Sequence, residues 1–175
     1  MATLYTVWKN GEKIGETRFE LSPGPRKRAG VFHPTAFGLT ALPGITAMFP
    51  ALLEFGAMCQ ERGVDVSDNR REVAEQAFET YSDSPEANRI RLAASHIAQL
   101  ELRDPNGQTL EWESIMISDM TTLADLAARH RPSARNQLKT LPGDPIRFMI
   151  STTLAAPSNM HRPNAFGASE SMGVC

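Results

Sequence analysis

The fold is organised around residues 97–117, which read IAQLELRDPNGQTLEWESIMI. Alternating apolar and polar residues lie on both sides of Asp104-Pro105-Asn106-Gly107, and this arrangement predicts a β-hairpin. Proline already has the φ angle that the second position of a type I turn requires. Gly107 can take the left-handed conformation that closes a bulged three-residue loop.

Two registers are possible for this hairpin. Pairing Asp104 with Gln108 sets Leu102 opposite Leu110, whereas a slip of one residue would set leucines against glutamates, so burial selects the first register. In that register the apolar face also pairs Leu100 with Trp112 and Ala98 with Ser114. The opposite face carries Glu101 across from Glu111, Gln99 across from Glu113, and Arg103 across from Thr109.

A second hairpin is predicted around Asn10-Gly11, the pair typical of a two-residue type I′ turn. Pairing outward from the turn sets Lys9 against Glu12, Trp8 against Lys13 and Val7 against Ile14. Ile14 and Phe19 are an odd number of residues apart, so a plain strand would point them to opposite faces. A bulge at Gly15 would restore the phase.

Helical spacing and capping residues predict the remaining elements. Ala41 to Arg62 has apolar residues at helical spacing, with Pro50 either as a kink or in the true first turn, and Gly63 as the stop. Gly30 to Gly44 contains two prolines and is expected to be an ordered loop. Further helices are expected after the Ser67-Asp68 and Ser84-Pro85 caps and from Thr122 towards Arg129, and a fifth strand over Ile146 to Thr152.

These elements predict an α+β domain over residues 1–156. Its antiparallel sheet contains two β-hairpins and a fifth strand, with three to four helices packed on one face. Residues 157–175 are rich in proline, serine, glycine and asparagine, and we expect them to form a flexible C-terminal tail.

Composition excludes several classes of function. The 175 residues are 41% hydrophobic and 22% charged with a net charge of -2, so no global attraction to nucleic acid or acidic membranes is expected. Two distant cysteines form neither a disulfide framework nor a zinc-ligand pattern, which favours a reducing cytoplasm. No signal peptide is apparent at the N-terminus. The apolar run from Ile45 to Cys59 is shorter than a bilayer-spanning helix, so no membrane segment is predicted.

The sequence lacks the usual signatures of catalysis. It has no glycine-rich nucleotide-binding motif and no serine-hydrolase motif, so no cofactor is expected. The four histidines, His33, His96, His130 and His161, include no pair at helical ligand spacing, so no metal site is expected. The basic run Arg26-Lys27-Arg28 has no interleaved aromatic residues, which disfavours nucleic-acid binding.

The candidate binding residues are Glu101, Glu111 and Glu113, with Arg103 at their margin. The chosen register would gather these carboxylates on one sheet face, where they could dock a basic partner surface, although a solvated outer face has the same pattern. His33 in the Gly30 to Gly44 loop and a partly exposed Trp8 complete the candidate surface.

The leading hypothesis is therefore a non-catalytic cytoplasmic protein-interaction domain, such as a regulator, adaptor or toxin-neutralising partner. It would bind another protein through the acidic sheet face and the adjacent loop; the oligomeric state stays open. One alternative is a carrier whose tail is modified by a partner enzyme at the terminal Cys175. Another is a small enzyme that uses His33 with Glu111 or Asp119.

Overall fold

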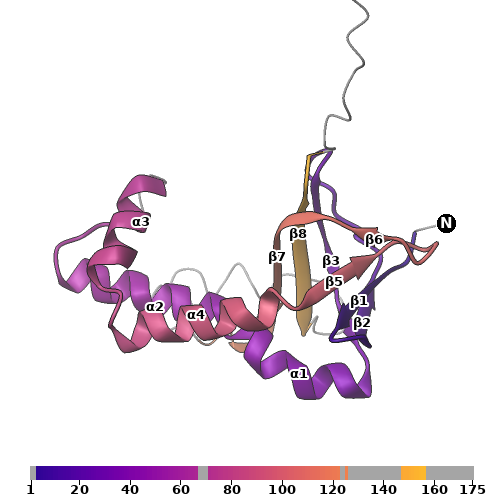
Figure 1. Ribbon diagram of the computed structural model, residues 1–175, viewed down its shortest axis with the longest axis horizontal. Helices are drawn as coiled ribbons and strands as arrows, with labels where there is room; N and C mark the ends of the chain where they lie inside the picture. Colours follow the sequence, from indigo (N-terminus) through magenta and orange to yellow (C-terminus); the bar gives the residue numbers. More distant parts are fainter. Residues whose placement is uncertain (1–2, 67–70, 123–124, 126–146, 157–175) are drawn as a thin grey trace, which may run out of the picture.

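The computed structural model of the chain describes residues 3–66, 71–122, 125 and 147–156. Four helices and two antiparallel sheets in these residues confirm the predicted α+β class (Figure 1). The helices are α1 (Ala36–Thr46), α2 (Met48–Glu61), α3 (Arg71–Thr80) and α4 (Pro85–Ile97). The strands are β1 (Tyr5–Lys9), β2 (Glu12–Thr17), β3 (Lys27–Val31), β4 (His33–Pro34), β5 (Leu100–Arg103), β6 (Thr109–Leu110), β7 (Trp112–Asp119) and β8 (Phe148–Leu154).

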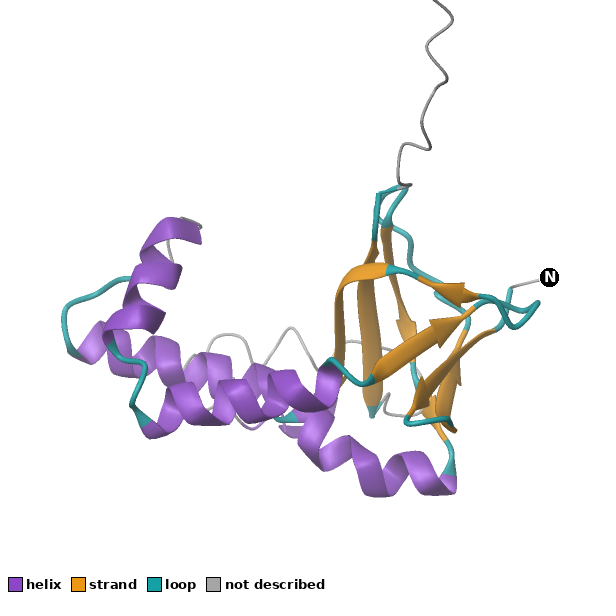
Figure 2. Ribbon diagram, viewed as in Figure 1, coloured by secondary structure: helices purple, strands orange, loops and turns teal. Residues whose placement is uncertain are grey.

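The strands form two sheets around one core, an arrangement that we call the barrel, rather than the single sheet expected. Their strand orders are β4-β2-β1-β5-β6 and β3-β8-β7. Phe32 alone separates β3 from β4, and Glu111 alone separates β6 from β7, so each of these two chain segments leaves one sheet and enters the other. The two sheets are therefore joined by chain continuity at both pairs of edges, β3 to β4 and β6 to β7. Figure 2 shows the sheets curving around a common interior.

The central hairpin is confirmed around its turn and ends earlier than expected. Leu102 lies opposite Leu110 and Arg103 opposite Thr109, and Gly107 has a φ of 81°. The predicted pairing of Leu100 with Trp112, and of Glu101 with Glu111, is wrong. The chain turns into the other sheet after Leu110, where Trp112 lies opposite Leu154 with an irregular register beside it. The alternation of apolar and polar residues does not predict where a strand leaves one sheet and enters the other.

The first hairpin also has the predicted turn, since Asn10 and Gly11 both have positive φ angles of 51° and 82°. Lys9 lies opposite Glu12 and Trp8 opposite Lys13, as expected. The register then shifts, so that Val7 lies opposite Gly15 instead of Ile14. The expected bulge is therefore present, and it turns the fully buried Ile14 into the barrel.

The prediction of a loop from Gly30 to Gly44 is wrong, because this segment contains β4 and most of α1. The Thr35 hydroxyl caps α1 by accepting a hydrogen bond from the Gly38 amide at 3.0 Å. Pro43 lies within α1, although the two prolines of this segment had favoured an ordered loop. Burial of Leu42 and Ile45 against the barrel provides the packing energy that intrinsic helix propensity lacks here.

Other helix signals behaved as expected. Pro50 lies in the first turn of α2, and Gly63, with a φ of 78°, follows its end. Ser84 caps α4 by accepting a hydrogen bond from the Ala87 amide at 3.1 Å. β8 confirms the fifth strand. The Ser67-Asp68 cap, most of the helix expected after Thr122, and the tail at 157–175 lie outside the described residues.

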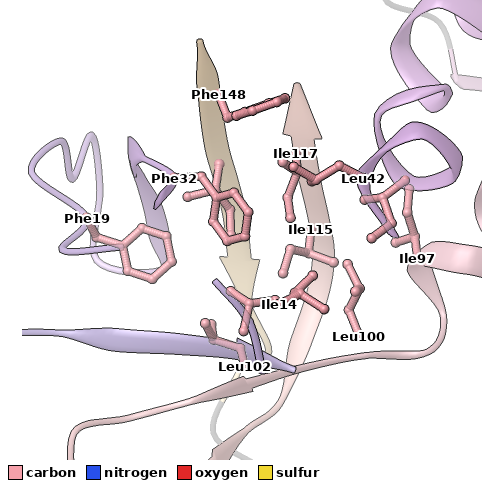
Figure 3. Packing of buried hydrophobic residues seen from close by; sticks show 13 residues of the cluster. Ile14, Phe19, Phe32, Leu42, Ile97, Leu100, Leu102, Ile115, Ile117 and Phe148 are labelled. Carbon is pink, nitrogen blue, oxygen red and sulfur yellow. The ribbon is translucent and has the colours of Figure 1, made fainter. Parts of the chain in front are cut away.

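Two separate cores hold the described part of the chain together. The larger one fills the barrel and includes Leu42 and Ile45 of α1 together with Ile14, Ile115 and Ile117. Figure 3 shows Leu42 beside Ile97, at the edge of this core where the helices lie. The smaller one joins Phe55 and Cys59 of α2 to Ala77 of α3 and Ala87 of α4. The helices were expected to cover one sheet face, but α2, α3 and α4 form an arm that projects from the barrel (Figure 1).

Candidate functional site

The outer face of the five-stranded sheet brings four side chains together, which we call the barrel-face cluster: Thr6, Trp8, Glu101 and Arg103. Trp8 lies opposite Glu101, and Thr6 lies opposite Arg103. Side chains of directly opposed residues share a face. The intervening residues Val7 and Leu102 are fully buried in the barrel, so the cluster lies on the outside.

The cluster is held by three polar contacts. The guanidinium carbon of Arg103 lies 4.2 Å from the centroid of the Trp8 ring, within cation–π range. Its Nη2 atom donates to Glu101 Oε2 at 2.8 Å, and Trp8 Nε1 donates to Thr6 Oγ1 at 2.9 Å. The Arg103 Nε atom is buried without a hydrogen-bond partner among the described residues. The indole and the guanidinium are therefore positioned before any ligand arrives.

A second set of charged residues extends the same face. Lys13 lies opposite Trp8, Glu16 opposite Thr6, and His33 opposite Glu16. Lys13 Nζ donates to Glu16 Oε2 at 2.7 Å. This hydrogen bond lowers the pKa of Glu16 from 4.5, with smaller contributions from the charges of Lys13, His33 and Arg18 and against a weaker effect of burial.

Four of the six predicted binding residues thus lie on one face: Trp8, Glu101, Arg103 and His33. The other two lie elsewhere. Glu111 sits at a barrel corner, and Glu113 in the other sheet pairs with Arg26 at 2.5 Å. The face is consequently not the acidic surface expected, because Glu16 and Glu101 are each paired with a cation.

Sequence reasoning missed Glu16 as part of this face. Lys13 and Glu16 are three residues apart, so a regular strand would point them to opposite sides. The bulge beside Ile14 adds one residue and brings both to the outer side. The odd spacing between Ile14 and Phe19 was the signal that could have placed Glu16 on this face, but it was used only to predict which residues are buried.

The structure does not bring the proposed catalytic residues together. His33 lies on β4 of the five-stranded sheet, whereas Asp119 ends β7 of the three-stranded sheet. Glu111 accepts a hydrogen bond from the Ala155 amide, while the Phe32 amide donates to Phe148 at the opposite end of β8, about 23 Å along the strand. Among the described residues, no hydrogen bond or ion pair joins His33 to Glu111 or Asp119.

A cavity of about 450 Å³ lies between α1, α2, α4 and the end of β7. Its apolar lining includes Pro43, Phe49 and Leu92. Its two acids are already engaged: Glu54 pairs with Arg89, and Asp119 Oδ1 accepts a hydrogen bond from the Thr121 amide at 3.0 Å. Among the described residues the lining contains no histidine or cysteine, and its hydroxyl groups are those of Thr46, Ser118 and Thr122.

The remaining candidate chemistry is limited in the part of the chain that the structure describes. No group of three or more histidine, cysteine, aspartate or glutamate residues there could hold a metal ion. Cys59 is fully buried, and this burial raises the pKa of its thiol. The predicted modification residue, Cys175, lies outside the described residues.

One apolar segment of the described chain, Ala36–Glu61, has the length and composition of a membrane-spanning helix. It comprises α1 and α2 and is 26 residues long, with 22% of its 18-residue apolar window buried. Core helices of soluble proteins can have the same length and composition, although they are mostly buried.

Comparisons with protein-family models, curated protein sequences and solved structures find no match.

Proposed function

We propose that this protein is a non-catalytic protein-interaction domain that binds its partner through the barrel-face cluster. The observation that carries this proposal is the stacking of Arg103 on Trp8, with Glu101 holding the guanidinium in place. Tryptophan and arginine are the residue types that most often dominate the energy of protein interfaces. A side chain that is already ordered loses less entropy when a partner binds.

The chemistry of this face also indicates what the partner presents. A flat indole offers apolar contact area, while the exposed parts of Arg103 and Lys13 are hydrogen-bond donors. A complementary surface would combine an apolar patch with carboxylate or carbonyl oxygens. We no longer expect the partner surface to be basic, because that expectation depended on three clustered glutamates, and Glu111 and Glu113 lie away from this face.

Site-specific photo-crosslinking in the native cells tests this proposal with the full chain. A benzoylphenylalanine residue would replace Thr6, at the centre of the cluster, and in a matched control it would replace Glu75 on α3. We expect a protein captured from position 6 and absent from position 75. That protein would then be purified, and its Kd for the domain measured directly.

Three variants complete the experiment. Trp8→Ala and Arg103→Lys should each weaken binding by about tenfold or more, since the lysine keeps the charge but loses the planar stacking. Arg71→Ala removes an ion-paired arginine on α3, whose side chain is 90% exposed against 28% for Arg103, and should leave the Kd unchanged. Equal affinities for the wild type, Trp8→Ala and Arg103→Lys would refute the proposal.

A further inference from the structure

The outer surface of α1 and α2 is unusually poor in polar groups. Between Ala36 and Cys59 the polar side chains other than cysteine are Thr40, Thr46 and Glu54. Three large apolar side chains on these helices are nevertheless exposed: Phe37 by 43%, Leu39 by 49% and Leu52 by 42%. Phe37 and Leu39 flank the exposed side of α1, where Ala36, Thr40 and Pro43 lie between them, and Leu52 is on α2. We call Phe37, Leu39 and Leu52 the apolar helix surface. A soluble surface normally interrupts such residues with charges.

Each of the three polar side chains is satisfied within the protein. The Thr40 hydroxyl donates to the Phe37 carbonyl oxygen at 2.7 Å, and the Thr46 hydroxyl donates to the Leu42 carbonyl oxygen at 2.9 Å. Glu54 forms an ion pair with Arg89 of α4. The stretch from Ala36 to Cys59 therefore presents no unpaired charge and no side-chain hydrogen-bonding group that lacks a partner; the exposed Gln60 and Glu61 follow it at the end of α2.

We infer that the apolar helix surface lies against the hydrocarbon of a lipid bilayer. A surface without free charges or free hydrogen-bonding groups is best matched by the hydrocarbon interior of a bilayer, which has neither. A protein interface of ordinary size instead has about one hydrogen bond per 100–200 Å² and a polar rim. In lipid every polar group must be satisfied within the protein, as the hydroxyls of these two threonines are by backbone carbonyls of their own helix. Prolines and glycines are also more frequent in membrane helices than in soluble ones.

The segment lies on the bilayer rather than crossing it. The other side of α1 is committed to the barrel, where Leu42 and Ile45 are buried and the backbone of Gly38 touches Ile14. Spanning would require α1 to leave this core. The helices would instead lie in the plane of the membrane with their exposed side chains among the acyl chains, as interfacial helices do.

The expectation of no membrane contact rested on the shorter run from Ile45 to Cys59. The structure shows that the helical segment begins nine residues earlier, at Ala36. Since the chain has a net charge of -2 and the segment carries no free cation, attraction to acidic headgroups does not contribute. Binding should therefore occur on uncharged lipid and persist at high salt.

Vesicle flotation with the full chain tests the inference. We expect the protein to float with vesicles of pure phosphatidylcholine, both in dilute buffer and in about 1 M sodium chloride. Leu39→Lys and Leu52→Lys should each lower the ratio of vesicle-bound to free protein on the order of tenfold, because a charge replaces a leucine that would lie among the acyl chains. Leu21→Lys is the matched control, since Leu21 is 58% exposed on the barrel; it should float like the wild type.

Circular dichroism of each variant would establish that it is folded, and the two single substitutions on different helices provide independent readings. Failure of the folded wild type to float would overturn the inference. So would a dimer that Leu39→Lys and Leu52→Lys dissociate without any effect on flotation, because the occupant would then be a second copy of the chain. Flotation should be unaffected by Trp8→Ala, which separates this test from that of the barrel-face cluster.

Discussion

The carbonyl oxygen of Ile14 occupies the space that a side chain on Gly38 would need. An ideal Cβ atom on Gly38 would lie 1.8 Å from this oxygen, far inside van der Waals contact. The same oxygen accepts a hydrogen bond from the Thr35 amide at 2.9 Å, so it cannot move away without breaking the helix entry. The absence of a side chain at Gly38 therefore allows α1 to close the end of the barrel.

We expect Gly38→Ala to lower the free energy of unfolding by about 3 kcal/mol, because the methyl group forces helix and strand apart. Urea denaturation measures this difference. Gly56→Ala is the matched control: Gly56 lies within α2, its added Cβ would be 3.7 Å from Val66, and the substitution should stabilise by about 0.5–1 kcal/mol. A Gly38→Ala variant as stable as the wild type would contradict this account of the helix–barrel junction.

The carboxylate of Asp104 should hold the central turn. Its Oδ1 atom accepts hydrogen bonds from the amides of Asn106 at 2.9 Å and Gln108 at 2.8 Å. Asp104→Ala should cost about 1–2 kcal/mol of stability and speed amide exchange at these two positions. Gln108→Ala keeps both backbone donors and should change stability by less than about 0.5 kcal/mol. Equal exchange rates in Asp104→Ala and wild type would show that the turn does not need this carboxylate.

Glu16 should make stability depend on pH in the acidic range. Because its pKa is lowered in the folded state, chiefly by the Lys13 hydrogen bond, its contribution is fully present above about pH 4.5. It is lost as the pH falls through the lowered folded-state pKa. Both side chains are about one-third exposed, so solvent screening limits the pair to about 0.5 kcal/mol.

Glu16→Gln should therefore be less stable than the wild type by about 0.5 kcal/mol at about pH 7 and equally stable at about pH 2.5. Urea titrations at both values measure the difference. Glu12→Gln removes one exposed carboxylate from the same strand and serves as the control. A difference for Glu16→Gln that is independent of pH would mean that the substitution acts through packing.

The Ser84 cap should stabilise the helical arm. Ser84→Ala leaves the Ala87 amide without its partner and should cost about 1 kcal/mol. Ser95→Ala, within α4, removes a hydroxyl that bonds only the preceding turn and should be neutral or slightly stabilising. Thermal unfolding followed by circular dichroism compares the two, and an equal effect of both substitutions would argue against a capping role.

Elements with strong local signals were predictable from the sequence. The Asn10-Gly11 and Asp104 to Gly107 turns demand particular backbone angles, and their neighbouring pairs follow within a few residues. The Ser84 cap and the Gly63 stop are likewise local, since each satisfies backbone groups of its own helix. The candidate surface was predictable only in part: Trp8, Glu101, Arg103 and His33 share a face, while Glu111 and Glu113 do not.

What the sequence alone determined is the set of turns, caps and alternating strands, because these depend on contacts between residues close together in the chain. The tertiary structure alone decided where each strand changes sheet. The corner at Phe32 exists because its ring packs against Gly15 from another strand, and the corner at Glu111 because the next residue finds its partner in β8. These are contacts between residues far apart in the chain, whose energy appears only when the barrel closes. The change of sheet separated Glu111 and Glu113 from Glu101, whereas the bulge beside Ile14 placed Lys13 and Glu16 on the outer face with Trp8.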